Sequence, residues 1–226
     1  MTRDRIREAY RAAQENYAQW GVDTEAALAR LDRIEISMHC WQGDDVTGLE
    51  AAGAGASGGI LSTGNYPYKP HNGDELRQDI EAALRLIPGP QRLNLHASYA
   101  EPVSAGLDRD RYDTACYARW MDWAADRKLP LDFNPTSFGH PKAADDLTLS
   151  HPDVGIRSFW IDHFRACRAI AADIGRWQGS TCLVNHWVQD GMKDLTPNRY
   201  AYRERLRDAL DQVLMVRYPG TEVRDA

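Results

Sequence analysis

The stretch Ile34-Glu35-Ile36-Ser37-Met38-His39-Cys40-Trp41-Gln42-Gly43-Asp44-Asp45 decides the fold of this 226-residue chain. Its first five residues (34–38) are typical of a short β-strand, and the strand leads into a histidine, a bulky aromatic and two carboxylates. Proteins of the α/β class present functional side chains at the carboxyl ends of their strands in this way. Three later segments repeat the design, so we expect a site surrounded by four strand ends.

The later strands are expected at 92–95, 130–133 and 181–185. Helical spacing of apolar residues predicts helices at 3–20, 23–31, 72–87, 110–127, 153–177 and 197–214, with Asn72 and Thr196 as N-caps and a short charged tail after Gly220. Repeated strand–loop–helix units predict a parallel sheet with helices outside it.

Four such units amount to half of a closed eight-stranded barrel. We therefore predict an α/β fold of TIM-barrel type, with N-terminal helices plus about four βα units as a partial barrel. Residues 1–33 would form a helical extension, and residues 34–226 would form the first half of the (β/α)8 barrel.

A glycine-rich loop is expected over 43–72, and its centre at 51–59 has almost no side chains that could pack. The spacing of Gly53, Gly55 and Gly58 matches the dinucleotide-binding fingerprint, but no apolar strand precedes it and no helix follows it. We therefore interpret the loop as a mobile lid over a site, with a disordered surface insertion as the alternative.

The composition excludes several classes of function. The net charge of −6 argues against a nucleic-acid partner, which requires clustered basic residues. The sequence contains no run of about 18 apolar residues, so we expect no membrane-spanning helix. The four cysteines form no C-x-x-C pair, which argues against a zinc or redox motif. We expect a cytoplasmic protein.

His96 closes the second expected strand, where it is either a core histidine or a ligand contact that transfers protons. Trp41, Phe138 and Trp187 lie just after three of the strands, and together they suggest an apolar collar around a polyol. Three asparagines at strand ends could supply hydrogen bonds to such a ligand: Asn94, Asn134 and Asn185.

Other polar residues carry weaker signals. Asp44 and Asp45 could bind a hard cation, but adjacent acids in a glycine-rich loop are usually solvated. His163 lies on the apolar face of a helix, so we interpret it as a core residue.

Six segments of the chain resemble the N-terminal half of L-rhamnose isomerase, and the resemblance extends from about residue 6 to about residue 215. They are 37–45 (SMHCWQGDD), 63–67 (TGNYP), 86–90 (LIPGP), 93–96 (LNLH), 131–135 (LDFNP) and 190–194 (DGMKD).

The resemblance implies a TIM barrel, usually a homotetramer, that interconverts L-rhamnose and L-rhamnulose by a hydride shift between C2 and C1. It implies a divalent metal, typically Mn²⁺. By motif, His96 matches the histidine that assists opening of the sugar ring. Trp41, Phe138 and Trp187 match the aromatic walls of the sugar site, and Phe133 is a weaker candidate for the same wall. The glycine-rich loop matches a segment that closes over the site.

The family's metal-binding carboxylates and histidines and its catalytic lysine come from strands after this point, so no metal ligand carries over to this chain. We therefore expect the chain to be inactive by itself. The alternatives are a non-enzymatic half-barrel fragment that needs a partner chain, or another sugar isomerase of the xylose-isomerase-like superfamily.

Overall fold

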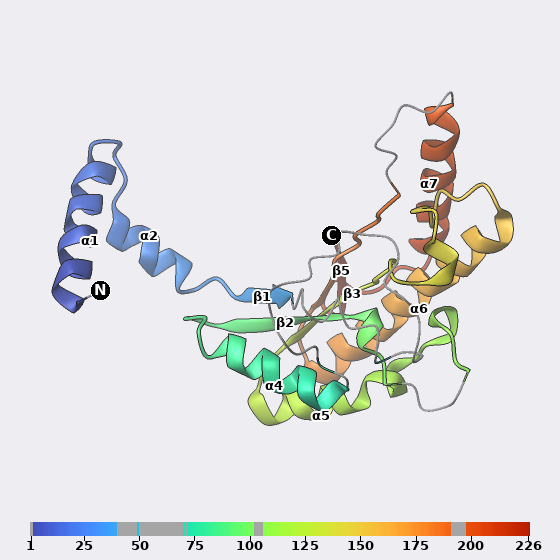
Figure 1. The fold of residues 1–226 in the computed structure, drawn as a ribbon, viewed down its shortest axis with the longest axis horizontal. Coiled ribbons are helices and arrows are strands. Elements are labelled where there is room, and N and C mark those ends of the chain that lie inside the picture. The colour runs from blue at the N-terminus through green and yellow to red at the C-terminus, as the bar shows by residue number, and fades with distance from the viewer. Residues whose placement is uncertain (1, 40–48, 50–69, 71, 102–105, 191–197) are drawn as a thin grey trace.

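The computed structural model describes residues 2–39, 49, 70, 72–101, 106–190 and 198–226 (Figure 1). These residues form six α-helices: α1 (Arg3–Ala18), α2 (Thr24–Leu31), α4 (Gly73–Leu84), α5 (Ala118–Arg127), α6 (Val154–Gln178) and α7 (Arg199–Val213). The strands are β1 (Ile36–His39), β2 (Gln91–His96), β3 (Leu131–Asn134), β4 (Cys182–Val184) and β5 (Val223–Asp225). Short 3₁₀ turns lie at Ala97–Tyr99, Arg109–Arg111, Thr114–Tyr117 and Pro141–Ala143.

The five strands form one parallel sheet in the order β1-β2-β3-β4-β5, which is also their order in the chain. A strand order without reversal, joined by crossovers of one hand, brings the connecting helices to one face of the sheet. Figure 1 shows α4, α5 and α6 along that face. The α/β class and the parallel sheet are thus confirmed. Within the described parts of the chain, the sheet is open and does not close into a barrel.

β5 corrects the prediction of four strands, because the tail after Gly220 was expected to be irregular. Val223 pairs with Cys182 and Asp225 pairs with Val184. The backbone N–H of Cys182 also donates to the carbonyl oxygen of Glu222 at 2.8 Å. Three residues in the sequence Val-Arg-Asp carry no strand periodicity, so pairing with β4 makes this segment a strand.

Two element boundaries also differ from the prediction. The first strand spans Ile36–His39 and therefore includes the histidine that was placed in the loop. The helix expected at 110–127 begins only at Ala118, after two 3₁₀ turns. Both 3₁₀ turns begin at an aspartate whose side chain accepts a backbone N–H, and such local bonds compete with a continuous helix.

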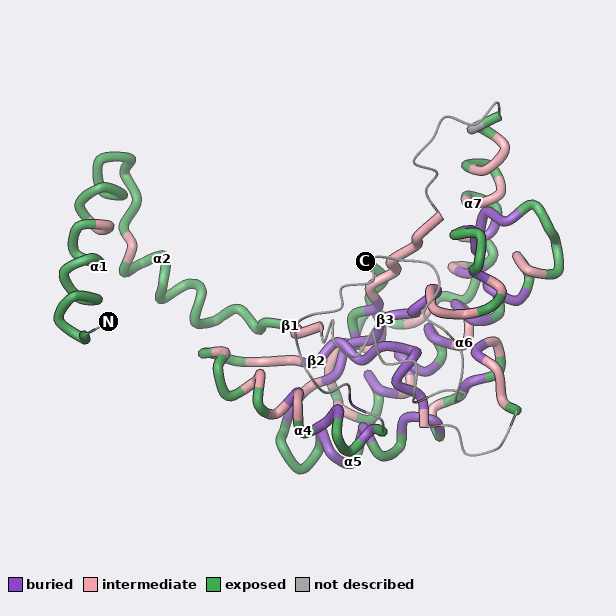
Figure 2. Tube along the Cα trace, in the orientation of Figure 1, coloured by how far each residue is buried: buried purple, intermediate pink, exposed green. Residues whose placement is uncertain are grey.

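Side chains of β2 alternate between the two faces of the sheet. Leu93 and Leu95 are fully buried in the main core with Leu76 and Ile80 of α4. Since successive residues of a strand point to opposite faces, Asn94 and His96 lie on the face without these helices. Figure 2 shows the buried segments concentrated between the sheet and α4–α6.

The buried carboxylate of Asp132 joins four strands on the helix-free face. Arg92 of β2 binds Asp132 of β3, with Nη2 at 2.8 Å from Oδ1. The hydroxyl of Ser37 in β1 donates to Asp132 Oδ2 at 2.7 Å, and the backbone N–H of Leu183 in β4 donates to Asp132 Oδ1 at 2.9 Å. One carboxylate therefore fixes the register of β1 to β4.

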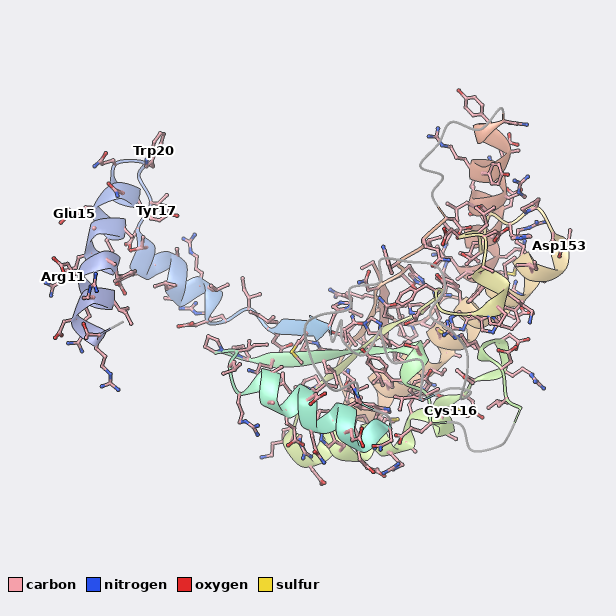
Figure 3. All side chains as sticks on the ribbon, viewed as in Figure 1. Arg11, Glu15, Tyr17, Trp20, Cys116 and Asp153 are labelled. Carbon is pink, nitrogen blue, oxygen red and sulfur yellow. The ribbon has the colours of Figure 1, made fainter. Side chains whose placement is uncertain are left out.

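Helix α1 and helix α2 form a hairpin in which no residue is buried (Figure 3). Trp20 lies at the turn between them and is 84% exposed. The Tyr10 hydroxyl of α1 donates to Glu25 Oε1 of α2 at 2.9 Å, which holds the two helices side by side.

The predicted helix caps have different outcomes. Asn72 caps α4 as predicted, because its Oδ1 accepts the Glu75 backbone N–H at 2.9 Å. Thr196 lies outside the described residues, and Asn198 caps α7 instead by accepting the Ala201 N–H at 3.2 Å. None of the helices in the described ranges is both long enough and apolar enough to cross a bilayer.

Candidate active site at the carboxyl edge of the sheet

His96 ends β2 and is 2% exposed, on the helix-free face at the carboxyl edge of the sheet. Its Nε2 lies 3.2 Å from Nδ1 of His39, the last residue of β1, and its Nδ1 lies 3.2 Å from Oγ1 of Thr136. The Tyr99 ring stacks on the His96 imidazole with centroids 5.1 Å apart. Two adjacent strands and the loop after a third therefore hold one imidazole.

Arg109 and His163 anchor the loop after β3 through contacts with its backbone carbonyl groups. The buried Arg109 guanidinium donates to the carbonyl oxygens of Thr136 and Phe138, at 3.1 Å and 2.8 Å. His163 is fully buried, as predicted for a core residue, and its Nε2 lies 3.0 Å from the Thr136 carbonyl oxygen. These contacts fix the segment that carries both the His96 partner and the aromatic Phe138.

His163 itself is electrically neutral. Its two ring nitrogens face carbonyl oxygens of Arg109 and Thr136, at 3.1 Å and 3.0 Å. Burial and the nearby positive charge of Arg109 lower the pKa of His163 to about 3, and outweigh the two carbonyl contacts. A neutral imidazole can donate to only one of the two carbonyls, so this residue supports the site without exchanging protons near neutral pH.

Phe138 and Trp187 form an aromatic pair at the same edge of the sheet. Their rings meet edge to face with centroids 5.3 Å apart. Phe138 follows β3 by four residues and Trp187 follows β4 by three. Because Arg109 binds the carbonyls of both Thr136 and Phe138, the pair and the His96 contact belong to one anchored loop system.

Several buried polar atoms near these strand ends have no hydrogen-bond partner among the described residues. Asn94 and Asn134 are 1% and 3% exposed, and the Oδ1 atom of each is unpaired. Ser137 Oγ, His186 Nδ1 and both amide atoms of Gln189 are unpaired as well. A buried polar atom without a partner costs about 1–3 kcal/mol, so these atoms suit a ligand that is rich in hydroxyl groups.

His186 follows β4 and binds the last strand. Its Nε2 lies 2.7 Å from Asp225 Oδ1, and Asp225 also accepts from Arg168 of α6. Burial lowers the pKa of His186 although Asp225 opposes the shift. Burial raises the pKa of Asp225, but the hydrogen bonds from Arg168 and His186 lower it overall. This ion pair stabilises β5 more directly than it serves the site.

The structure separates the predicted aromatic residues. Phe138 and Trp187 are in contact. Phe133 is fully buried in the main core, with its ring edge to face against Tyr117 at 5.1 Å. Trp41, Asp44, Asp45 and most of the glycine-rich loop at 43–72 lie outside the described residues.

Sequence reasoning missed His39, Thr136 and Arg109. His39 carried a usable signal, because two adjacent parallel strands that both end in histidine place the two rings at one edge. Thr136 and Arg109 had no such signal. Their roles come from a 3₁₀ turn and a loop that meet only in the folded chain.

The described residues do not supply the metal centre that the resemblance implies. Within them, no group of three or more His, Cys, Asp or Glu side chains is placed to hold a metal ion. The carboxylates near the site are engaged elsewhere: Asp132 binds Arg92, and Asp190 accepts the backbone N–H groups of Thr148 and Ser150.

Comparisons with known proteins agree on one family. The sequence model of that family, L-rhamnose isomerase (RhaA), matches residues 4–224. The L-rhamnose isomerases of Salmonella agona (strain SL483) and Salmonella heidelberg (strain SL476) are each 49% identical to the chain over 221 residues, which is 98% of this chain and 52% of the relative. The chain thus spans about half the length of the curated relatives it matches.

Proposed function

Because this chain belongs to the L-rhamnose isomerase family, we propose that it forms the sugar-binding half of an enzyme that interconverts L-rhamnose and L-rhamnulose. The finer parts of the proposal rest on the family resemblance: a closed TIM barrel, a homotetramer, Mn²⁺ as the metal, and a cytoplasmic role in rhamnose catabolism.

The observation that carries the proposal is the fixed imidazole of His96 beside unpaired amide oxygens. His96 is held by His39 and Thr136, while Asn94 Oδ1 and Asn134 Oδ1 are buried without partners among the described residues. Asn94 lies directly beside His39, and Asn134 directly beside His96, in the strand registers. Two acceptors and an imidazole at one edge suit the hydroxyl groups of a sugar.

The proposed walls of the sugar site are aromatic. Phe138 and Trp187 supply a contact pair, which would cover the apolar C–H faces of the sugar. Trp41 completes the wall in this proposal, on family resemblance alone. Phe133, the weaker candidate, is packed in the main core against Tyr117, on the opposite face of the sheet from His96. Apolar aromatic side chains on one side and amide acceptors on the other would orient a polyol by shape and by hydrogen bonds.

In the proposed mechanism, His96 holds or moves a proton at the ring oxygen of the bound sugar and so assists ring opening. Asn94 and Asn134 accept from sugar hydroxyls and fix the open chain. The described residues hold no metal-binding group, so the hydride shift is not assigned to them. We therefore propose that the chain alone does not catalyse the isomerisation.

Fragment complementation tests this function. The chain is assayed with L-rhamnose and Mn²⁺, first alone and then with a separately expressed second half of the Salmonella agona relative. We expect turnover only in the mixture, and we expect His96→Asn in the mixture to lose most of it. His151→Asn is a matched control, because His151 lies in the loop before α6 and is paired with Asp145 (Nε2 to Oδ2, 3.0 Å).

Three results would contradict the proposal. Turnover by the chain alone would show that it holds a complete site. A well-assembled mixture without turnover would leave a non-enzymatic half-barrel as the better interpretation. Turnover of other aldoses in preference to L-rhamnose would favour the alternative of a different sugar isomerase.

A further inference from the structure

Three side chains form a hydrogen-bonded row across the carboxyl edge of the sheet. Thr136 Oγ1 lies 3.2 Å from His96 Nδ1, and His96 Nε2 lies 3.2 Å from His39 Nδ1. The row runs from the loop after β3 through the end of β2 to the end of β1. Thr136 is fully buried and His96 is 2% exposed, so bulk water does not compete for the central ring.

The hydroxyl of Thr136 decides where the protons of this row lie. Among the described residues, His96 Nδ1 is the one side-chain partner of the Thr136 hydroxyl. A buried hydroxyl that did not donate to this nitrogen would leave its proton unpaired, which is unfavourable in a site without water. We therefore assign the hydroxyl as the donor and His96 Nδ1 as the acceptor.

The remaining protons follow from this assignment. A neutral imidazole that accepts at Nδ1 carries its proton at Nε2. The N–H at His96 Nε2 then donates to His39 Nδ1, which must be unprotonated to accept it. In the alternative order, His39 donates to His96 Nε2, and His96 then carries its proton at Nδ1. That N–H would face the Thr136 hydroxyl, so the hydroxyl proton would either oppose it or have no acceptor.

Ring contacts prevent His96 from turning to another arrangement. Tyr99 stacks on one face of the imidazole, with an interplanar angle of 25°. The His39 ring meets the His96 ring at 90°, with centroids 5.4 Å apart. A ring held on its face and along its edge keeps the orientation that its hydrogen bonds select.

We propose that His39 is a positioning residue that, together with Thr136, holds His96 in its Nε2–H form, so that His96 acts as a hydrogen-bond donor toward a sugar oxygen. The inference rests on the proposed function for the identity of the ligand. His39 accepts the Nε2 proton in the absence of sugar, and a sugar oxygen at this edge shares or replaces that contact. The site thereby presents a donor at His96 beside acceptors at Asn94 and Asn134.

Nitrogen-15 NMR of the histidine side chains tests the inference on the full chain without sugar. Long-range ¹H–¹⁵N spectra distinguish protonated from unprotonated ring nitrogens. We expect His96 to show an unprotonated Nδ1 and a protonated Nε2 at neutral pH. A protonated His96 Nδ1 in the native chain would overturn the assignment.

Variants test the two neighbours separately. His39→Leu removes the acceptor and should reduce the Nε2–H population of His96, whereas His39→Asn keeps an acceptor oxygen near the place of Nδ1 and should preserve it. Thr136→Val removes the donor and should allow the Nδ1–H form to appear. The His151 spectrum should stay unchanged in every variant, which reports that the fold is intact, because His151 is paired with Asp145 and accepts the Asp153 N–H. An unaltered His96 in both His39→Leu and Thr136→Val would refute the positioning role.

Activity of the complemented enzyme separates this inference from the proposed function. We expect His39→Leu to lower kcat/KM for L-rhamnose by at least about tenfold and His39→Asn to restore most of it. A mixture without activity, but with His96 in the Nε2–H form, would refute the proposed function and leave the proton order standing. An active mixture in which the two variants are equal would refute the role of His39 alone.

Discussion

Arg168 of α6 binds Asp225 of β5 through two parallel contacts, Nε to Oδ1 at 2.8 Å and Nη2 to Oδ2 at 2.9 Å. The guanidinium is 3% exposed, and its Nη1 also donates to the carbonyl oxygens of Val213 and Val216. Arg168 therefore joins α6, the end of α7 and β5. A strand of three residues at the edge of the sheet is therefore held by this side chain in addition to its backbone pairing with β4.

Asp225→Asn should destabilise the fold by about 1–2 kcal/mol, because it removes the counterion of a buried arginine, while the partly exposed carboxylate is screened by solvent. Urea unfolding followed by circular dichroism measures the change. Asp208→Asn is the matched control, since Asp208 pairs with Arg207 at an exposed position and should change the free energy of unfolding by less than about 0.5 kcal/mol. Equal effects of the two variants would show that the Arg168–Asp225 pair is not the anchor of β5.

Gly175→Ala should also destabilise the protein, by about 1–3 kcal/mol. A Cβ atom at Gly175 in α6 would lie 2.1 Å from the carbonyl oxygen of Glu222, which precedes β5. An unobstructed Gly→Ala change inside a helix would instead stabilise by about 1 kcal/mol. Gly220→Ala meets no atom within 4 Å and serves as the control for thermal unfolding. A stabilised Gly175→Ala variant would contradict the close approach of α6 to β5.

Stability should fall as the pH decreases from about 6.5 toward 3, because the pKa of His163 is lowered to about 3. In this window the unfolded histidine binds a proton and the folded one does not, so the unfolded state gains one proton. Linkage then gives a slope of about 1.4 kcal/mol per pH unit from this residue. Unfolding in urea at pH 7, 6 and 5 measures it.

His163→Gln should remove that part of the pH slope, whatever its effect on stability at pH 7. His140 and His186 also have lowered pKa values, mainly through burial, so they add to the slope in the same direction. If the native chain kept constant stability between pH 7 and pH 5, a neutral His163 would be excluded.

Trp187→Leu in the complemented enzyme should raise KM for L-rhamnose by about five- to tenfold, because an aromatic contact contributes about 1 kcal/mol beyond its area. Steady-state kinetics measure the effect. Trp177→Leu is the control. Trp177 lies near the end of α6, just before β4 begins, and therefore at the amino end of the strand that Trp187 follows. A matching rise in KM for both variants would argue against Trp187 as a wall of the sugar site.

The sequence predicts the strand–loop–helix alternation because strands such as 92–95 and helices such as 153–177 carry strong apolar patterns of their own. It predicts His96 as a site candidate for the same reason, since a polar residue at the end of an apolar strand stands out. β5 was missed because its stability comes from Arg168, Glu222 and the β4 backbone, all of which are distant in the chain.

The partners of His96 also differ in how far the sequence could predict them. His39 was placed in the loop because the strand was predicted to end one residue earlier, at Met38, whereas the pairing of His39 with Asn94 extends β1. Thr136 and Arg109 meet through a loop and a 3₁₀ turn whose positions depend on packing against α6. The motif resemblance identifies His96 and the aromatic wall residues. The partners of His96 and the direction of its hydrogen bonds, in contrast, depend on the folded geometry.

The strand order of the sheet has a consequence for how the chain is made. Each strand pairs with the strand that precedes it in the sequence, so a growing polypeptide always has its next partner already in place. The sheet can therefore assemble progressively during translation, in the direction of synthesis, with α4, α5, α6 and α7 added one crossover at a time.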